Sequence, residues 1–332
     1  MRWILLVLII IFVGYGWHTT IFTPISLSFS PSQIPEDVEG YLLHEEAKFA
    51  DIKPGLQKQI IWNDPASKQK TAYSIVSIHG FSTSKEEIRP IPDNMAAELG
   101  ANLFYTRLAG HGRTIKAMGE VSYNDWVNDT AEAFEVGRRI GDKTIIIATS
   151  LGGALATWLL KTKDEYQEDI AAIILVSPSY ELEYFGTSLI TAPYASLVVR
   201  ALLGPTRCDN MQATLREFYA FSVCYPTKSL LPLAQFIDLA FRSEKAPSDV
   251  PALFIYGLED KVVDSVRTNE VYETWGSNTE RLLLENTKGS PSQTAHVPIG
   301  DFYDPQNNSA AMRKISSWLH EVTQEKSVPD SQ

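Results

Sequence analysis

The sequence predicts an α/β protein whose mostly parallel central sheet is covered by helices. Apolar runs rich in β-branched residues recur along the chain, and stretches of helical character separate them. The chain has 332 residues and is 44% hydrophobic, which is enough for one sizeable core. The predicted strands cover residues 72–78, 102–106, 144–148, 171–176, 251–256 and 280–284.

A long insertion is predicted to interrupt this core. The strand pattern stops near residue 178 and resumes near 248, and the intervening segment is too long for a simple loop. We expect it to form a cap. The predicted parts are an N-terminal segment at 1–25, a lead-in at 26–70, the core at 71–178 and 248–322, the cap at 179–247 and a disordered tail at 323–332.

The N-terminal segment is predicted to be a single transmembrane helix that anchors the protein. Residues 3–13 are strongly apolar and have the length of the apolar part of a signal peptide. Continued to Ile25, the segment reaches about 20 residues, enough to span a bilayer. No clear cleavage site follows, although 26–28 is a weak candidate. We expect an uncleaved anchor with Arg2 inside and the folded domain outside the cytoplasm, periplasmic if the source is bacterial; secretion after cleavage is the alternative.

A serine stands where the strand at 144–148 gives way to a helix within one turn. The residues Ala148-x-Ser150-x-Gly152 follow the G-x-S-x-G pattern except for alanine at its first position. Small neighbours are needed because the helix packs closely behind the serine, whose Oγ the sharp turn exposes above the sheet. Ser150 is therefore the predicted nucleophile, and an ordinary strand–helix junction is the alternative.

Two residues after later strands complete the order serine, acid, histidine. Asp260 follows the fifth predicted strand and is the predicted acid, with Glu259 and Asp264 as competitors. His296 lies in a polar loop after the sixth strand and is the predicted base. An exposed loop histidine without a catalytic role is the alternative for His296.

The first predicted strand runs into the sequence His79-Gly80-Phe81. Gly80 allows a tight turn, so that the backbone N–H of Phe81 can point into the site beside the N–H of Leu151. Two such donors form an oxyanion hole. His79 is expected to be structural, because it comes too early in the chain to replace His296.

These residues together resemble those of the α/β-hydrolases, and more narrowly the capped serine hydrolases that include monoglyceride lipases and serine-aminopeptidase-like esterases. The resemblance covers positions from about 75 to 320 and implies an α/β-hydrolase fold with a helical cap over the site. It also implies that His111 braces a Gly-His-Gly turn. The residues that carry the resemblance are His79-Gly80-Phe81, 108–113, 122–129, the Ser150 turn, Asp260 and His296.

The cap is predicted to contain helices at 194–203, 211–221 and 230–241. An insertion at the carboxyl ends of the strands roofs the site, so its aromatic side chains are candidates for an acyl pocket. The alternative is that they form the core of the cap itself. The candidates are Phe185, Tyr219, Phe221, Phe236 and Phe241.

Composition excludes several kinds of partner. No Cys, His and Asp cluster has metal-ligand spacing, and no phosphate loop or dinucleotide fingerprint is present, so neither a metal nor a cofactor is implied. The net charge of −11 argues against nucleic acid as a partner. Cys208 and Cys224 both fall in the cap; the sequence leaves open whether they form a disulfide or remain thiols.

The predicted function is a membrane-anchored serine hydrolase that cleaves carboxylic esters, with acyl lipids or other small esters as substrates. Amide or peptide hydrolysis is the alternative within enzymes, because the same machinery cleaves both. A catalytically silent acyl-binding protein is the alternative outside them. A complete triad argues against a silent protein, and serine rather than aspartate at position 150 argues against dehalogenase or epoxide hydrolase chemistry.

Overall fold

The structure, a computed structural model, describes residues 24–183, 195–209, 213–242, 246–276 and 278–325. The predicted anchor lies outside these ranges except for its last two residues. Phe185 and most of the predicted tail also lie outside them. Within the described ranges, no helix has both the length and the apolar character needed to cross a membrane.

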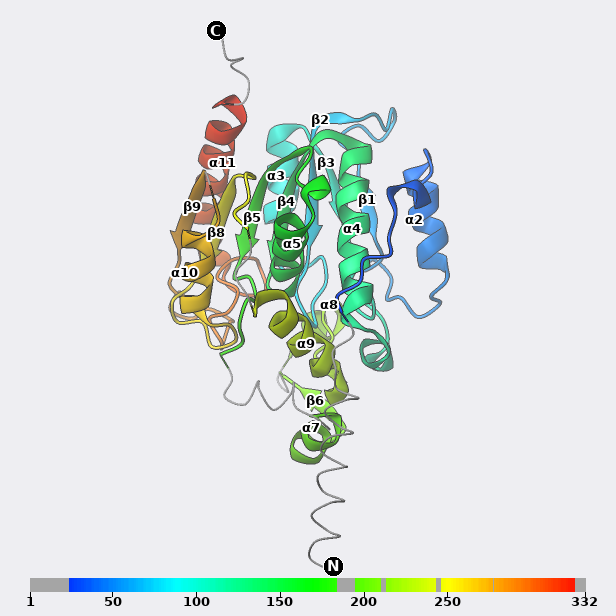
Figure 1. Cartoon of the computed structure of the whole chain (residues 1–332), viewed down its shortest axis with the longest axis vertical. Coiled ribbons are helices and arrows are strands. Elements are labelled where there is room, and N and C mark those ends of the chain that lie inside the picture. Colours follow the sequence, from blue (N-terminus) through cyan, green and yellow to red (C-terminus); the bar gives the residue numbers. More distant parts are fainter. Residues whose placement is uncertain (1–23, 184–194, 210–212, 243–245, 277, 326–332) are drawn as a thin grey trace, which may run out of the picture.

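A seven-stranded sheet forms the centre of the described chain (Figure 1). Its order is β1-β3-β2-β4-β5-β8-β9, in which β1 is antiparallel to β3 and the other neighbours are parallel. All the predicted strands are present, and the α/β class is confirmed. Only β1 is unpredicted here, because three residues are too few to show a period. The strands are β1 (Gln59–Ile61), β2 (Thr71–Ile78), β3 (Asn102–Tyr105), β4 (Gly141–Thr149), β5 (Ile170–Val176), β8 (Ala252–Tyr256) and β9 (Thr279–Leu283).

The inner strands read as continuous apolar runs because both faces of the sheet are covered. In β4, Ile146 packs into the core on one face, whereas Ile145 and Ile147 pack into the core on the other. All three side chains are fully buried. A strand that was covered on one face only would alternate apolar and polar residues instead.

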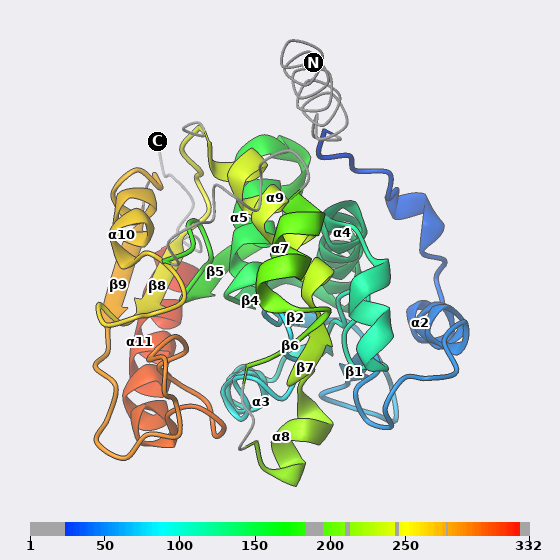
Figure 2. The same cartoon turned by 90° about the horizontal axis from the view of Figure 1, so that it is seen from below.

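Helices cover the two faces of the sheet (Figures 1 and 2). Trp126 of α4 and Leu155 of α5 belong to the apolar cluster on one face, and Met95 of α3 and Trp318 of α11 belong to the cluster on the other. The four helices are α3 (Ile91–Leu99), α4 (Tyr123–Ile140), α5 (Leu151–Thr162) and α11 (Asn308–Glu325). Further helical segments are η1 (Pro31–Gln33), α2 (Val38–Ala47), η2 (Ile115–Glu120), η3 (Asp164–Tyr166), α10 (Ser265–Glu273) and η5 (Pro305–Asn307).

The described residues between β5 and β8 lie at the carboxyl end of the sheet, the lower end in Figure 1, and α9 among them packs into the apolar cluster on one face of the sheet. Figure 2, seen from below, shows α7, α9 and β7 in front of the sheet. The short β6 and β7 pair antiparallel and are joined by a disulfide between Cys208 and Cys224. The elements are α7 (Ala195–Leu203), β6 (Thr206–Cys208), α8 (Leu215–Ala220), β7 (Cys224–Pro226), η4 (Thr227–Ser229) and α9 (Leu230–Phe241).

Candidate active site

Ser150 occupies the strained turn between β4 and α5. Its backbone has φ 51° and ψ −117°, a conformation that residues other than glycine rarely adopt. A Cβ on Gly152 would lie 2.5 Å from the carbonyl oxygen of Ile78, and one on Gly153 would lie 2.9 Å from Cβ of Pro178. Both glycines are therefore needed for α5 to pack against the ends of β2 and β5.

The three side chains predicted as a triad meet at the carboxyl edge of the sheet. Nε2 of His296 lies 2.9 Å from Oγ of Ser150, and its Nδ1 lies 2.7 Å from Oδ2 of Asp260. Ser150 directly follows β4, whereas Asp260 and His296 lie in the loops that follow β8 and β9. The arrangement is the chain of hydrogen bonds by which a base activates a hydroxyl nucleophile and is itself oriented by a carboxylate.

Asp260 is held on both sides, unlike its competitors. Its Oδ1 accepts hydrogen bonds from the N–H groups of Val262 at 2.8 Å and Val263 at 3.1 Å, which leaves Oδ2 for the imidazole. Glu259 is exposed to solvent. Asp264 caps the N-terminus of α10 through two backbone N–H groups. Of the three carboxylates, Asp260 is the one that is hydrogen-bonded to the histidine.

The surroundings of His296 make its imidazole a stronger base. Burial alone would lower the pKa of its imidazole, but the charge and hydrogen bond of Asp260, together with the charge of Glu87, raise that pKa above the ordinary 6.5. A general base works best when its pKa lies near the working pH. His296 therefore has the electrostatic environment of a base that accepts a proton and holds it transiently.

The turn at Gly80 passes between the serine and a buried carboxylate. A Cβ on Gly80 would lie 2.9 Å from both Cβ of Ser150 and Oε1 of Glu87, so a larger residue does not fit. The N–H of Gly80 donates to Oε2 of Glu87 at 2.7 Å. The next N–H, that of Phe81, has no acceptor among the described backbone hydrogen bonds. Leu151 is the first residue of α5, so its N–H has no acceptor within the helix either.

The two histidines near this turn are structural, as predicted. Nδ1 of His79 donates to the carbonyl of Gly80 at 2.8 Å, and its Nε2 accepts from the N–H of Leu108 at 3.1 Å. Nδ1 of His111 likewise donates to the carbonyl of Ala109 at 3.0 Å, and its Nε2 accepts from the N–H of Ser82 at 3.0 Å. Burial lowers the pKa of His79 to about 4 and that of His111 well below its ordinary value. Both rings therefore stay neutral and connect the two turns.

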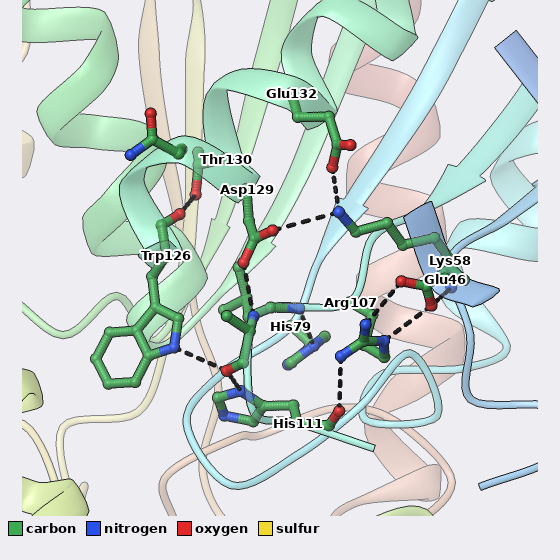
Figure 3. A network of polar contacts seen from close by, with 12 residues as sticks. Glu46, Lys58, His79, Arg107, His111, Trp126, Asp129, Thr130 and Glu132 are labelled. Atoms are coloured by element: carbon green, nitrogen blue, oxygen red, sulfur yellow. Dashed lines mark hydrogen bonds and ion pairs between the residues drawn. The ribbon is translucent and has the colours of Figure 1, made fainter. Parts of the chain in front are cut away.

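A buried polar network supports these turns from behind (Figure 3). The N–H of Ala109 donates to Oδ2 of Asp129 at 2.6 Å, and its carbonyl accepts from Nε1 of Trp126 at 3.0 Å. Nζ of Lys58 lies 3.3 Å from Oδ1 of Asp129 and also pairs with Glu132. The backbone before His111 is thereby fixed by side chains of α4.

An arginine extends this network on its other side (Figure 3). Arg107 forms a bidentate pair with the carboxylate of Glu46 at 2.8 and 2.7 Å, and donates to the carbonyl of His111 at 3.1 Å. All three side chains are buried. Planar, bidentate pairs of this kind hold their partners in one geometry, so the turn that carries His111 is tied to α2.

The aromatic residues predicted for an acyl pocket have different surroundings. Phe236 is fully buried and packs edge-on against Trp158 at a centroid distance of 6.5 Å, so it is a core residue of the α5–α9 contact and not a pocket residue. Tyr219 is 47% exposed, and its hydroxyl bonds the carbonyl of Pro54. Phe236 therefore fits the alternative, a core residue of the cap, whereas the pocket role of Tyr219 stays a prediction. Helical periodicity alone does not show which side of a cap helix faces the site.

Phe221 and Phe241, the two remaining candidates within the described residues, have different neighbours. Phe221 packs against Phe302 at 4.7 Å and Tyr303 at 5.9 Å. Phe241 packs against Tyr180 at 4.8 Å and, with it, lines a cavity of about 510 Å³ between α9 and α10. No triad residue lines that cavity. The fifth candidate, Phe185, lies outside the described residues.

Two residues near the triad were not predicted from the sequence. Glu87 is 2% exposed, and burial raises the pKa of its carboxyl to about 7. Ser179 is 2% exposed, and its Oγ lies 3.0 Å from Oγ of Ser150. Ser179 follows β5 by three residues, and this position at a strand end is the one signal that could have found it. Glu87 lies in a loop without a motif, and nothing local marks it.

Within the described ranges, no cluster of three or more His, Cys, Asp or Glu side chains could hold a metal ion.

A serine on a strained turn at the carboxyl edge of a mostly parallel sheet is the arrangement that defines the α/β-hydrolases, and the protein is an enzyme of that class. The chain belongs to the family described as serine aminopeptidase, S33, whose model matches residues 69–287.

Several solved structures share this fold. One of the metagenome-derived lipolytic enzymes LipS and LipT has a TM-score of 0.61 at 19% identity, over 81% of this chain and 99% of its own. The Paleococcus ferrophilus monoacylglycerol lipase has a TM-score of 0.56 at 14% identity, over 80% and 99%. A soluble variant of the Saccharomyces cerevisiae monoglyceride lipase has a TM-score of 0.56 at 13% identity, over 80% of this chain and 91% of its own. No curated protein matches the sequence.

Proposed function

We propose that the protein is a serine hydrolase that cleaves carboxylic esters of acyl lipids or related small molecules through an acyl-enzyme. One observation carries the proposal, the continuous hydrogen-bonded chain from Oγ of Ser150 through His296 to Asp260. A serine hydroxyl is a weak nucleophile unless an adjacent base takes its proton, and this geometry supplies the base and its orienting acid.

In the first half of the reaction, Oγ of Ser150 attacks the ester carbonyl carbon. The O–H bond breaks, its proton passes to Nε2 of His296, and the carbonyl electron pair moves onto oxygen. We propose that the N–H groups of Phe81 and Leu151 donate to that oxyanion. When the intermediate collapses, His296 returns the proton to the departing alcohol, and an ester between Ser150 and the acyl group remains.

In the second half, water replaces the alcohol. His296 takes a proton from water, the hydroxide attacks the acyl carbon, and Oγ of Ser150 leaves with the proton that His296 returns. Asp260 stays ionised throughout and stabilises the imidazolium. Its two backbone donors support this role, because they hold the carboxylate in the orientation that faces Nδ1 of His296.

Esters are preferred to amides as the substrate class because the similar structures are lipases. The family description favours the alternative, an aminopeptidase-like amide hydrolase. A panel of p-nitrophenyl esters of increasing acyl length, set against aminoacyl p-nitroanilides, separates the two. Turnover of the anilides above that of every ester would replace the ester assignment with the amide one.

The test of the nucleophile is labelling with a fluorophosphonate. The wild-type protein should be labelled once, and Ser150→Ala should lose both labelling and ester turnover while its thermal unfolding midpoint stays close to that of the wild type. Labelling that persists in Ser150→Ala would contradict the assignment. A wild-type protein that is neither labelled nor active would instead favour a silent acyl-binding protein.

We also propose that residues 1–25 anchor the enzyme in a membrane, with the catalytic domain outside the cytoplasm. The apolar sequence supports this proposal. The N–H of Ser26 donates to Oδ1 of Asn124 at 2.9 Å, in the first turn of α4. Because α4 leads into the start of β4, its own start lies at the carboxyl edge of the sheet. The described chain therefore begins on the side of the active site, which suits an enzyme that takes its substrate from a bilayer.

Fractionation of the full chain tests the anchor. The protein should sediment with membranes, resist extraction by carbonate and be accessible to protease added from the non-cytoplasmic side. Alkylation should reveal the thiols of Cys208 and Cys224 only after reduction, as expected for a disulfide in an oxidising compartment. A soluble, shortened chain would favour signal cleavage, and protection on the cytoplasmic side would overturn the orientation.

A further inference from the structure

A second serine hydroxyl touches the oxygen of the proposed nucleophile. Oγ of Ser179 lies 3.0 Å from Oγ of Ser150, and their residues are 2% and 7% exposed. A side chain that is so well buried has little access to solvent partners. The contact therefore belongs to the resting site and is not a surface feature.

The direction of this hydrogen bond follows from counting protons. Oδ2 of Asp260 can only accept when ionised, so Nδ1 of His296 carries a proton. A general base is neutral before it takes the proton of the nucleophile, so Nε2 is then the acceptor. The hydroxyl proton of Ser150 then points to Nε2. A hydroxyl has one proton and two lone pairs, so Oγ of Ser150 can only accept from Ser179. Ser179 is the donor.

The backbone holds Ser179 in place from both ends. Its own N–H donates to the carbonyl of Ser150 at 3.0 Å. The preceding Pro178 packs against Gly153, because a Cβ on Gly153 would lie only 2.9 Å from Cβ of Pro178. A bulkier residue than glycine at position 153 would push Pro178, and with it Ser179, away from the nucleophile. The second glycine of the serine turn thus serves this contact.

The residues that follow Ser179 are equally fixed. The hydroxyl of Tyr180 bonds that of Thr157 in α5 at 2.7 Å. The N–H of Glu183 donates to the carbonyl of Val262 at 3.0 Å, in the loop that holds Asp260. Residues 179–183 therefore connect the nucleophile turn to the acid loop, and the hydroxyl of Ser179 is preorganised.

We propose that Ser179 is a further catalytic residue, which donates a hydrogen bond to Oγ of Ser150 whenever negative charge develops there. This inference rests on the proposed function. Charge develops on Oγ when its proton moves to His296 during attack, and again when the C–O bond of the acyl-enzyme breaks and Oγ departs. A fixed donor in a buried site stabilises that charge without reorganisation of water.

The test compares Ser179→Ala with two other variants. Hydrogen bonds to charged groups are stronger than neutral ones, so Ser179→Ala should lower both kcat for p-nitrophenyl esters and the fluorophosphonate labelling rate about 10- to 100-fold, at nearly unchanged KM. Ser179→Cys keeps a weak donor and should lie between wild type and alanine. The matched control is Ser177→Ala, since the buried hydroxyl of Ser177 has no partner among the described residues; it should keep wild-type rates.

The outcomes separate this inference from the proposed function. If Ser150→Ala abolishes labelling but Ser179→Ala labels at the wild-type rate, Ser179 is not catalytic and the triad stands. If Ser150→Ala is still labelled, the proposed function fails first. Equal losses in kcat for Ser179→Ala and Ser177→Ala, with matching losses in thermal midpoint, would show a packing role and overturn the inference.

Discussion

Replacement of Asp260 by asparagine tests whether this side chain sets the tautomer of His296. Oδ1 of Asp260 faces the N–H groups of Val262 and Val263, at 2.8 and 3.1 Å, and Oδ2 faces Nδ1 of the histidine at 2.7 Å. The two N–H groups require an acceptor, so the asparagine oxygen takes the place of Oδ1. Its NH₂ group then faces Nδ1.

An imidazole nitrogen that faces an NH₂ group must accept, so the ring proton moves to Nε2 and Ser150 loses its base. The opposite amide orientation would bring NH₂ against two backbone donors and leave both unpaired, which excludes it. With the geometry preserved and the tautomer wrong, kcat should fall about 10⁴-fold. That change corresponds to about 5.5 kcal/mol in the activation barrier.

Steady-state hydrolysis of a p-nitrophenyl ester measures this loss. Absorbance gives the protein concentration, and circular dichroism checks that the variant is folded. Glu259→Gln is the matched control, because Glu259 is exposed and one residue away; it should stay within about twofold of the wild type. An asparagine variant that kept more than a tenth of the wild-type kcat, or a greater loss in Glu259→Gln, would refute the reasoning.

Three further predictions concern the surroundings of the triad. Glu87→Gln keeps an acceptor for the Gly80 N–H but removes a charge that raises the pKa of His296. The acidic limb of the pH profile of kcat/KM should therefore move to lower pH, and a limb that stayed or moved to higher pH would contradict this. Gly152→Val forces a Cβ to within 2.5 Å of a backbone carbonyl, so the thermal midpoint should drop by the equivalent of at least about 1–3 kcal/mol, and an unchanged midpoint would disprove the close approach. Lys58→Met leaves the buried carboxylate of Glu132 and the partly buried one of Asp129 without their cation. The free energy of unfolding in denaturant should fall by about 3–5 kcal/mol, which an unshifted midpoint would refute.

The sequence by itself determined the inner strands and the chain order of the triad. Buried parallel strands are continuous apolar runs, so β4 and β5 are visible without any partner. Parallel strands end at one edge, so residues just past them, such as Ser150 and Asp260, are expected to converge. The close packing behind Ser150 is also local, since it requires small residues at fixed offsets.

Only the tertiary structure decided which side chains complete the site. Ser179 contacts Ser150, and Glu87 lies behind the Gly80 turn that packs against Ser150. Neither residue belongs to a motif, because both contacts depend on how separate segments pack. The three-residue strands β1, β6 and β7 are too short for a period and exist through their partners. The assignment of Phe236 to the core rather than to a pocket was also tertiary, because a helix pattern shows that one face is buried but not what covers it. A local sequence pattern predicts whether a residue is buried or exposed. Its contact partners depend on distant segments that come together only when the chain folds.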